Sequence, residues 1–158
     1  HVVLVGYGEK GKIILDELLQ RHLSVVVVDD HHAVVEELRE KKVNSIYGDA
    51  TDPAILIQAH IHEAAILVLA IDNEILCRKI VETAKILRPT IETVMPAENE
   101  EDAKALKADG VAQAFVPDEL LAQAIVQFTM SRFGKESEDQ KIREEEAEEQ
   151  KAIERGAL

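Results

Sequence analysis

The sequence feature that most constrains the fold is a cluster of glycines near the start of the chain. Three of the seven glycines stand at Gly6, Gly8 and Gly11 in the segment GYGEKG, which fits the pattern G-x-G-x-x-G. The preceding residues, Val-Val-Leu-Val at 2–5, are typical of a strand buried on both faces, and apolar residues at helical spacing follow. A strand before this pattern and a helix after it predict a phosphate-binding turn in preference to a connection without a ligand.

Each glycine has a physical task in such a turn. Gly6 permits a tight turn, Gly8 leaves space for a phosphate to approach the backbone, and Gly11 lets the helix pack close to the strand. The free N–H groups and the partial positive charge at the N-terminus of the helix then favour an anion. The predicted cofactor-binding residues of this turn are Gly6, Tyr7, Gly8, Glu9, Lys10 and Gly11.

Apolar periodicity divides the chain as far as residue 133 into strands that alternate with helices. The predicted strands are 2–5, 25–28, 45–47, 65–71, 91–95 and 114–116. Six alternations with short connections predict an α/β fold: a Rossmann-like, doubly wound, parallel six-stranded sheet with helices on both faces. From Gly134 onward the sequence is acidic and has almost no core-forming residues. We therefore predict a nucleotide-binding domain over 1–133 and an acidic, solvated or helical tail over 134–158.

Two carboxylates end the second predicted strand. Asp29 stands 18 residues after Gly11, where an acidic side chain can accept hydrogen bonds from both hydroxyls of a ribose. Asp29 and Asp30 together would repel a 2′-phosphate, so the pair favours NAD or an adenosine nucleotide over NADP. The alternative is an N-cap of the helix that begins at His31 and His32. Both hold if Asp29 binds ribose and Asp30 caps the helix.

Two further loops follow strands and complete the predicted cofactor site. Asp49 and Ala50 follow the third strand, where the carboxylate could accept from an adenine amino group and the Ala50 N–H could reach a ring nitrogen. The alternative for this loop is a turn and a helix cap. Ala70, Ile71 and Asp72 follow the fourth strand, near the point where the strand order reverses, and the small Ala70 lets a ligand approach. Asp72 belongs to the predicted site. Asp72 or Asn73 is expected to cap the helix that follows, and for Asp72 this role is favoured over ligand contact.

The composition excludes several classes of function. With 31 acidic and 18 basic side chains the formal net charge is −13, which disfavours binding to nucleic acid or to anionic lipid. The single cysteine, Cys77, rules out an internal disulfide framework and fits a small core residue within a helix. The histidines at 31, 32, 60 and 62 have no cysteine or third histidine nearby at ligand spacing, so no metal site is predicted.

Four segments in order, GYGEKG, VVVVDD, YGDAT and LVLAID, together resemble the RCK N-terminal domain, also called the KTN or TrkA-N domain. They are most similar to the cytoplasmic regulatory domain of Kef-type cation:proton antiporters. The resemblance covers residues 1–133. It implies a Rossmann-like sheet, a homodimer, and a bound NAD(H), AMP or ATP that sets the state of an attached membrane-embedded antiporter or channel domain. It also implies that this domain and the transport domain share one polypeptide at the cytoplasmic face of the inner membrane, and it does not imply catalysis.

This chain departs from the family pattern in the region expected to hold phosphate. Many members carry an arginine at the position of Glu9 and another in an A-R-A segment after the fifth strand, where residues 94–97 here read VMPA. Both departures remove positive charge, and Glu9 adds a negative one. A triphosphate such as ATP should therefore bind less well than AMP or NAD(H), whose phosphates can be held by backbone N–H groups. An empty site is the other alternative.

The favoured function is a nucleotide-sensing regulatory domain of a potassium or other monovalent-cation transport protein, either an antiporter or a channel. The alternative is the cofactor domain of an NAD-dependent oxidoreductase that lacks its substrate domain. No Tyr-x-x-x-Lys pair is present to supply a general acid, since Tyr47 has no lysine four positions on. We therefore predict that the chain is not an enzyme and has no catalytic residue. Because it does not begin with Met, we expect it to be part of a longer protein.

Overall fold

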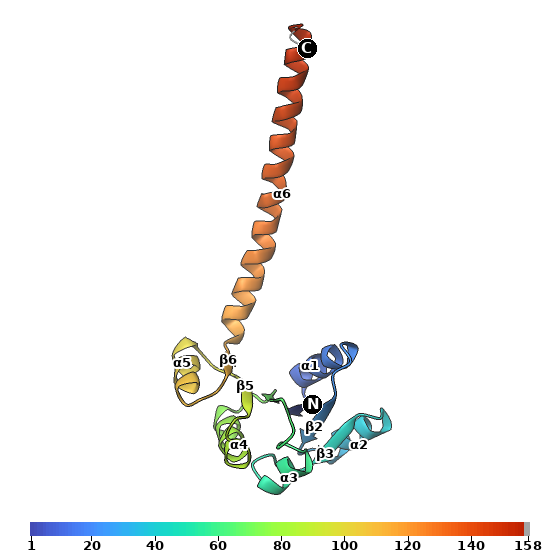
Figure 1. Ribbon diagram of the computed structural model, residues 1–158, viewed down its shortest axis with the longest axis vertical. Coiled ribbons are helices and arrows are strands. Elements are labelled where there is room, and N and C mark those ends of the chain that lie inside the picture. The colour runs from blue at the N-terminus through green and yellow to red at the C-terminus, as the bar shows by residue number, and fades with distance from the viewer. Residues whose placement is uncertain (157–158) are drawn as a thin grey trace. The chain divides into compact units, whose positions relative to one another are not determined.

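The computed structural model describes residues 1–156, except for the side chains of 135–138, and Figure 1 labels all of its helices and most of its strands. The strands are β1 (Val2–Val5), β2 (Val25–Asp29), β3 (Asn44–Tyr47), β4 (Ile66–Leu69), β5 (Glu92–Pro96) and β6 (Gln113–Phe115). The helices are α1 (Glu9–Gln20), α2 (His32–Glu40), α3 (Pro53–Gln58), α4 (Glu74–Leu87), α5 (Glu100–Ala108) and α6 (Pro117–Glu154). All six predicted strands are present, with ends within two residues of the predicted ones.

The six strands form one parallel sheet in the order β3-β2-β1-β4-β5-β6. Strand β1 is central: its Val5 is in register with Val28 of β2 on one side and with Leu69 of β4 on the other. The chain winds from β1 out to β3 and then returns across the sheet to add β4 beside β1. The predicted doubly wound arrangement is confirmed. In sheets of this kind the strands beside the reversal leave a crevice at their carboxyl ends.

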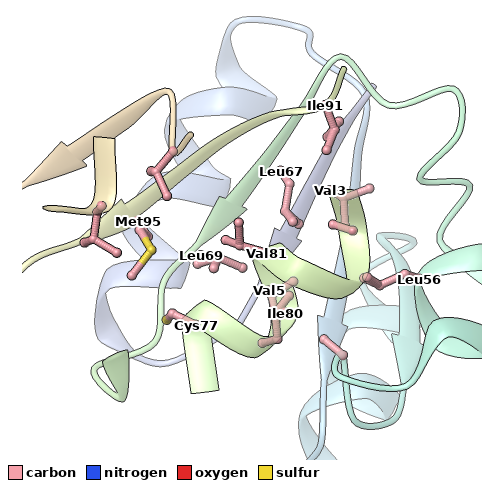
Figure 2. Close-up of a cluster of buried hydrophobic side chains, with 14 of the residues drawn as sticks. Val3, Val5, Leu56, Leu67, Leu69, Cys77, Ile80, Val81, Ile91 and Met95 are labelled. Carbon is pink, nitrogen blue, oxygen red and sulfur yellow. The ribbon is translucent and has the colours of Figure 1, made fainter. Parts of the chain in front are cut away.

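Alternate side chains of the sheet face two separate cores. On one face, Leu4 of β1 packs with Leu15 of α1 and Leu38 of α2. The cluster on the other face includes side chains of α3, α4 and α5, and its labelled members in Figure 2 are Val3, Val5, Leu56, Leu67, Leu69, Cys77, Ile80, Val81, Ile91 and Met95. Burial of each large apolar side chain contributes about 1.5–3 kcal/mol, so these contacts, more than local helix propensity, hold the helices on the sheet.

Three helices begin with a side-chain cap. The Asp52 carboxylate accepts from the N–H of Ala54 at 2.8 Å, with Pro53 at the first position of α3, as the Asp-Pro sequence predicts. Asn73 caps α4 and Asn99 caps α5 in the same way, each accepting from an N–H of the first turn. These caps set where each helix starts after its strand, and so they set the loops at the carboxyl end of the sheet.

Helix α6 runs without a break over the boundary that the sequence predicts at 133/134. The chain divides into two units, His1–Pro117 and Asp118–Leu158, and the 1–133 boundary stays a prediction. The acidic segment continues the helix because Glu, Lys, Arg and Gln are good helix formers and pairs such as Gln140 with Glu144 lie one turn apart, 3.2 Å between Nε2 and Oε1. None of the described helices is both long and apolar enough to span a membrane.

Candidate functional site

A pocket of about 500 Å³ opens at the carboxyl ends of β1, β2, β3 and β4. Ten of the thirteen predicted cofactor residues line it, namely Gly6, Tyr7, Gly8, Asp29, Asp30, Asp49, Ala50, Ala70, Ile71 and Asp72. The rest of its lining is formed by Val5, Val28, His31, Val34, Gly48, Leu76 and Ile80. The other three predicted residues, Glu9, Lys10 and Gly11, lie in the first turn of α1 and outside the lining. The structure therefore brings the four predicted loops together around one pocket.

The glycine-rich turn has the close contacts that only glycine allows. Gly6 has a φ of +94°, and a Cβ there would lie 3.2 Å from the carbonyl oxygen of Ala70. A Cβ on Gly11 would lie 2.1 Å from the carbonyl oxygen of Gly6, so α1 meets the turn backbone to backbone. A Cβ on Gly8 would meet no atom within 4 Å, so this position faces open space. The tight turn at Gly6 and the close approach at Gly11 are thus both present.

The N-terminus of α1 can hold an anion through its backbone. The helix begins at Glu9 with Gly8 at the N-cap, and no side chain caps it. The first N–H groups of a helix have no acceptor within the helix, and the aligned peptide dipoles give that end a partial positive charge. Because Gly8 lines the pocket, an anionic group in the pocket would lie beside these donors. The exposed carboxylate of Glu9 is in the same turn and offsets part of this attraction.

The Asp29 carboxylate is the buried polar group of the pocket, with 8% of the residue exposed. Its Oδ2 accepts from the Tyr7 N–H at 2.8 Å, and its Oδ1 accepts from the His31 N–H at 2.9 Å. The side chain of Asp29 therefore ties the end of β2 to the glycine-rich turn and to the start of α2. This tie fixes the carboxylate at the wall of the pocket and keeps it from rotating away, and ribose binding by Asp29 remains a prediction.

His31 is a pocket residue that we did not predict as part of the site. Its Nδ1 lies 3.0 Å from Asp29 Oδ1 and 2.8 Å from Asp30 Oδ1. The hydrogen bond with Asp29, followed by the negative charge of Asp30 and then that of Asp29, raises the pKa of His31 above its usual value. The sequence feature that could have identified His31 as a site residue is its position directly after Asp29 and Asp30.

The start of α2 corrects one prediction. His31 is the N-cap residue, and no side-chain capping hydrogen bond is present, so Asp30 does not cap the helix. Asp30 is exposed and pairs with the imidazole of His31 instead. The reason is that β2 extends to Asp29 and Asp30 lies in the turn after it. The N-cap position therefore falls on His31, one residue later than predicted.

The loop after β3 forms a local turn around Asp49. Its Oδ1 accepts from both the N–H and the hydroxyl of Thr51, each at 2.8 Å. These two hydrogen bonds, the backbone one first, lower the pKa of Asp49 below its usual value. The loop therefore forms the turn that was its alternative interpretation. The adenine contacts predicted for Asp49 and for the buried Ala50 remain predictions.

The loop after β4 shows which of the two candidate residues, Asp72 or Asn73, caps α4. Asn73, and not Asp72, caps α4, with its Oδ1 accepting from the Leu76 N–H at 3.0 Å. The Asp72 carboxylate instead pairs with Lys10 Nζ from the first turn of α1. This ion pair links the first turn of α1 to the loop after β4. It holds Lys10, the cation nearest to Gly8 in the sequence, at the Asp72 carboxylate. Cys77 is a buried residue of α4, and burial raises the pKa of its thiol to about 11.

A comparison of the chain with known families and proteins gives a consistent result. Residues 2–117 match the TrkA-N domain. The putative cation/proton antiporter YbaL of Escherichia coli is 29% identical over 127 residues, which is 80% of this chain and 23% of YbaL. Potassium channel protein 1 of Methanocaldococcus jannaschii is 33% identical over 119 residues, which is 74% of this chain and 36% of that protein. The chain therefore spans well under half the length of both relatives.

Solved structures show the same fold. The crystal structure of the TrkA-N domain of the inner membrane protein YbaL from Escherichia coli has a TM-score of 0.76 and 29% identity, and covers 81% of this chain and 95% of that chain. The Shewanella denitrificans Kef CTD in its AMP-bound form has a TM-score of 0.66, covers 82% of this chain and 79% of that chain, and at 24% identity shows the fold alone. The resemblance stated for the four sequence segments is confirmed. Because the family match includes every strand of the sheet and every residue that lines the pocket, this chain belongs to the TrkA-N domain family.

Proposed function

We propose that this chain is the nucleotide-sensing regulatory domain of a protein that transports potassium or another monovalent cation, and that an adenine nucleotide binds in its pocket. The observation that carries the proposal is the buried Asp29 carboxylate, which shares the pocket with Gly8 at the uncapped N-terminus of α1. One group is a fixed acceptor for sugar hydroxyls, and the other is a fixed set of N–H donors for phosphate. Together they match the two polar parts of a nucleotide.

In this proposal each part of the nucleotide has its own loop. The phosphate lies against Gly8, the ribose hydroxyls donate to Asp29, and the adenine lies between the loops after β2 and β3. The second carboxylate oxygen of Asp49 is outside the Thr51 turn and can accept from the adenine amino group. The apolar lining, which includes Val34 and Ala50, suits the faces of the base.

The ligand that we propose is NAD(H) or AMP, with ATP less favoured. Lys10 is held by Asp72, and Glu9 stands in the first turn of α1, so the phosphate region offers backbone donors and little net positive charge. Backbone donors suit a monophosphate or a pyrophosphate. The Kef domain of the same fold was solved in an AMP-bound form, which supports an adenine nucleotide as the class of ligand.

We further propose that the domain is attached to a membrane-embedded antiporter or channel domain of the same polypeptide, at the cytoplasmic face of the inner membrane. In support, one relative is named a cation/proton antiporter and another a potassium channel, and both are much longer than this chain. The ligand would change transport only through its different affinities for two arrangements of the assembly. This role needs no catalytic group, so the domain acts as a sensor and not as an enzyme.

The first half of α6 supports a homodimer as the assembly that responds. Leu121, Ile125 and Phe128 recur at the spacing of one helical face, and each is more than half exposed, at 62%, 57% and 62%. Contiguous exposed apolar residues on a protein surface mark an interaction site. We propose that this face contacts a second copy of the chain.

Calorimetry with NAD, NADH, AMP and ATP tests the proposal. We expect NAD(H) or AMP to bind, ATP to bind more weakly, and Asp29→Asn to reduce the affinity about tenfold or more, since a charge-assisted hydrogen bond to the ribose is lost. Asp16→Asn, an exposed acid on α1 away from the pocket, is the matched control and should bind like the wild type. The absence of heat and of any thermal shift with all four nucleotides would contradict the proposal. Consumption of NADH with simple carbonyl substrates would favour the oxidoreductase alternative.

A further inference from the structure

The hydrogen bonds of Asp29 leave too few acceptor positions for a ribose. Each carboxylate oxygen can accept about two hydrogen bonds. Oδ1 already faces two donor groups of His31, the backbone N–H at 2.9 Å and Nδ1 of the ring at 3.0 Å, while Oδ2 accepts from the Tyr7 N–H at 2.8 Å. One position therefore remains, and two ribose hydroxyls need two.

Among these three donors, the imidazole of His31 is the one that can leave. The two backbone N–H groups are held in place. The His31 carbonyl oxygen accepts from the N–H groups of Val34 and Val35 in the first turn of α2, at 3.1 and 3.2 Å, and the Gly6 N–H beside Tyr7 donates to the Val28 carbonyl oxygen at 2.9 Å. The His31 side chain is 75% exposed and can rotate into solvent. Its second partner, Asp30, is also exposed at 69%, so the ring can keep that contact when it leaves Asp29.

We propose that the imidazole of His31 occupies the ribose position on Asp29 in the nucleotide-free protein, so that a nucleotide must displace the ring in order to bind. This inference rests on the proposed function, and it makes His31 a residue that sets the affinity of the site. It also links binding to a proton, because a protonated ring holds two carboxylates and a neutral ring holds them less strongly.

The sign of the linkage follows from the contacts. In the nucleotide-free protein the pKa of His31 is raised from 6.5, first by the hydrogen bond with Asp29 and then by the charges of Asp30 and Asp29. Displacement from Asp29 removes part of this effect, so the pKa falls toward its usual value and a fraction of a proton is released. Affinity should therefore rise with pH between the lower pKa of His31 in the nucleotide-bound protein and its raised pKa in the nucleotide-free protein, and be constant below and above that window.

The charged groups around the ring support this assignment. Asp29 ends β2 and Asp30 follows it, and these two carboxylates act on the imidazole. The titratable side chains on the other walls of the pocket are Tyr7, Asp49 and Asp72, and in the described part of the chain none of them forms a hydrogen bond or ion pair with His31. On α2 itself the neighbouring His32 faces Glu36, at 4.0 Å, and the ring of Tyr47.

The test measures NAD affinity by calorimetry between pH 5.5 and 8.5 in the full chain. NAD is the probe because its pyrophosphate lacks the ionisation near pH 6 that a phosphomonoester such as AMP has. Wild-type protein should bind NAD more tightly as pH rises, with proton release that shows in buffers of different ionisation enthalpy. His31→Ala should bind roughly two- to fivefold more tightly than wild type at pH 6, the size of an exposed ion pair, and should lose the pH dependence.

Two further variants separate this role from a structural one. His31→Gln keeps a neutral hydrogen-bond donor for Asp29 but cannot be protonated, so we expect affinity near that of the wild type at high pH and no change with pH. His32→Ala removes the adjacent exposed histidine and should keep the wild-type profile. The His31 ring can also be titrated directly by NMR, where addition of NAD should lower its midpoint and Asp30→Asn should lower it without nucleotide.

The possible results distinguish this inference from the proposed function. If His31→Ala binds NAD with the wild-type affinity and the wild-type pH profile, the displacement of the ring is wrong and the nucleotide site stands. If NAD lowers the pH midpoint of His32 and leaves that of His31 unchanged, the displacement is also wrong. If no adenine nucleotide binds to the wild type or to any variant at any pH, the proposed function fails and this inference fails with it.

Discussion

Replacement of Gly11 by alanine tests whether α1 approaches the glycine-rich turn as closely as the structure shows. The added Cβ would lie 2.1 Å from the carbonyl oxygen of Gly6 and 3.0 Å from its carbonyl carbon. Both are backbone atoms, so no change of rotamer can relieve the contact, and either the helix or the turn must move. We therefore expect Gly11→Ala to destabilise the unit that contains the pocket.

Two opposing effects set the size of this loss. Insertion of an extra methyl group into a packed site typically costs about 1–3 kcal/mol, and contact with backbone places Gly11→Ala at the upper end, about 3 kcal/mol. Alanine in place of glycine within a helix contributes about 1 kcal/mol in the other direction. The expected net loss is about 2 kcal/mol, roughly a 30-fold change in the folding equilibrium constant.

Gly8 provides a matched control in the same turn. A Cβ there would meet no atom within 4 Å, and a φ of −76° with a ψ of −164° suits any residue. The reduced entropy of the unfolded chain stabilises Gly8→Ala by about 0.4–1 kcal/mol, and the weaker N-cap costs a similar amount, so stability should change by less than about 0.5 kcal/mol. NAD affinity should instead fall about tenfold or more, because the methyl group stands at the proposed phosphate position.

Urea unfolding and calorimetry with NAD separate the two variants. Tyrosine fluorescence follows the correct unit, since both tyrosines, Tyr7 and Tyr47, lie within residues 1–117 and the chain has no tryptophan. We expect Gly11→Ala to shift the unfolding midpoint and Gly8→Ala to leave it in place while weakening NAD binding. A Gly11→Ala protein as stable as the wild type would refute the close approach of α1, and a Gly8→Ala protein with unchanged affinity would refute the phosphate position.

Three further predictions concern stability and reactivity. Thr93→Val should raise the free energy of unfolding by about 1 kcal/mol, because the buried Thr93 hydroxyl has no hydrogen-bond partner within the described residues. Thr83→Val, its control, should lower that free energy by about 1 kcal/mol in the same urea titration, because the Thr83 hydroxyl donates to the Thr51 carbonyl oxygen at 3.2 Å. Cys77 should react with a thiol reagent at pH 8 only on unfolding, since burial raises its pKa to about 11; equal rates in native and unfolded protein would contradict this. The hydrogen bonds from Thr51 lower the pKa of Asp49, so Asp49 contributes fully to stability above its unfolded pKa of 3.8 and loses this contribution as pH falls through its lower folded pKa. The drop in melting temperature on Asp49→Ala should therefore be larger at pH 6 than at pH 3.

The sheet was predictable because its strands carry a strong and redundant signal. Residues 2–5 and 25–28 are continuous runs of β-branched and leucine residues, and each run ends in glycine or aspartate. In the structure these residues pair with one another and face helices on both sides, so nearly every one of them is buried. A run that is apolar on both faces fits only a central parallel strand, and so the sequence pattern and the packing select the same arrangement.

The helix caps were less predictable because they depend on the backbone of single residues. Asp72 and Asn73 have similar capping tendencies, and the choice between them depends on which residue stands where the strand-to-helix turn ends. Asn73 has a φ of −93° and a ψ of 101° and becomes the cap, which leaves Asp72 for Lys10. The same one-residue ambiguity at Asp30 and His31 explains why His31, whose imidazole contacts the predicted ribose acceptor, was not predicted as a site residue. Asp30 and Asp72 both line the pocket, where loop geometry decides which side chains are free to meet a ligand.

The charge of the pocket itself decides which phosphate chain it can accept. Four carboxylates line it, those of Asp29, Asp30, Asp49 and Asp72, while no lysine or arginine is among the described residues of its lining. Within the part of the chain that the structure describes, Lys10 is not in the lining and pairs with Asp72 alone. Phosphate must then rely on the N–H groups of one helix terminus, whose number does not grow with the ligand. Repulsion from the carboxylates grows with each added phosphate charge, because it depends on the total charge brought near them. Attraction is therefore limited while repulsion is not, and under the proposed function this difference favours a nucleotide of few phosphates even though the glycine-rich turn alone would admit a longer chain.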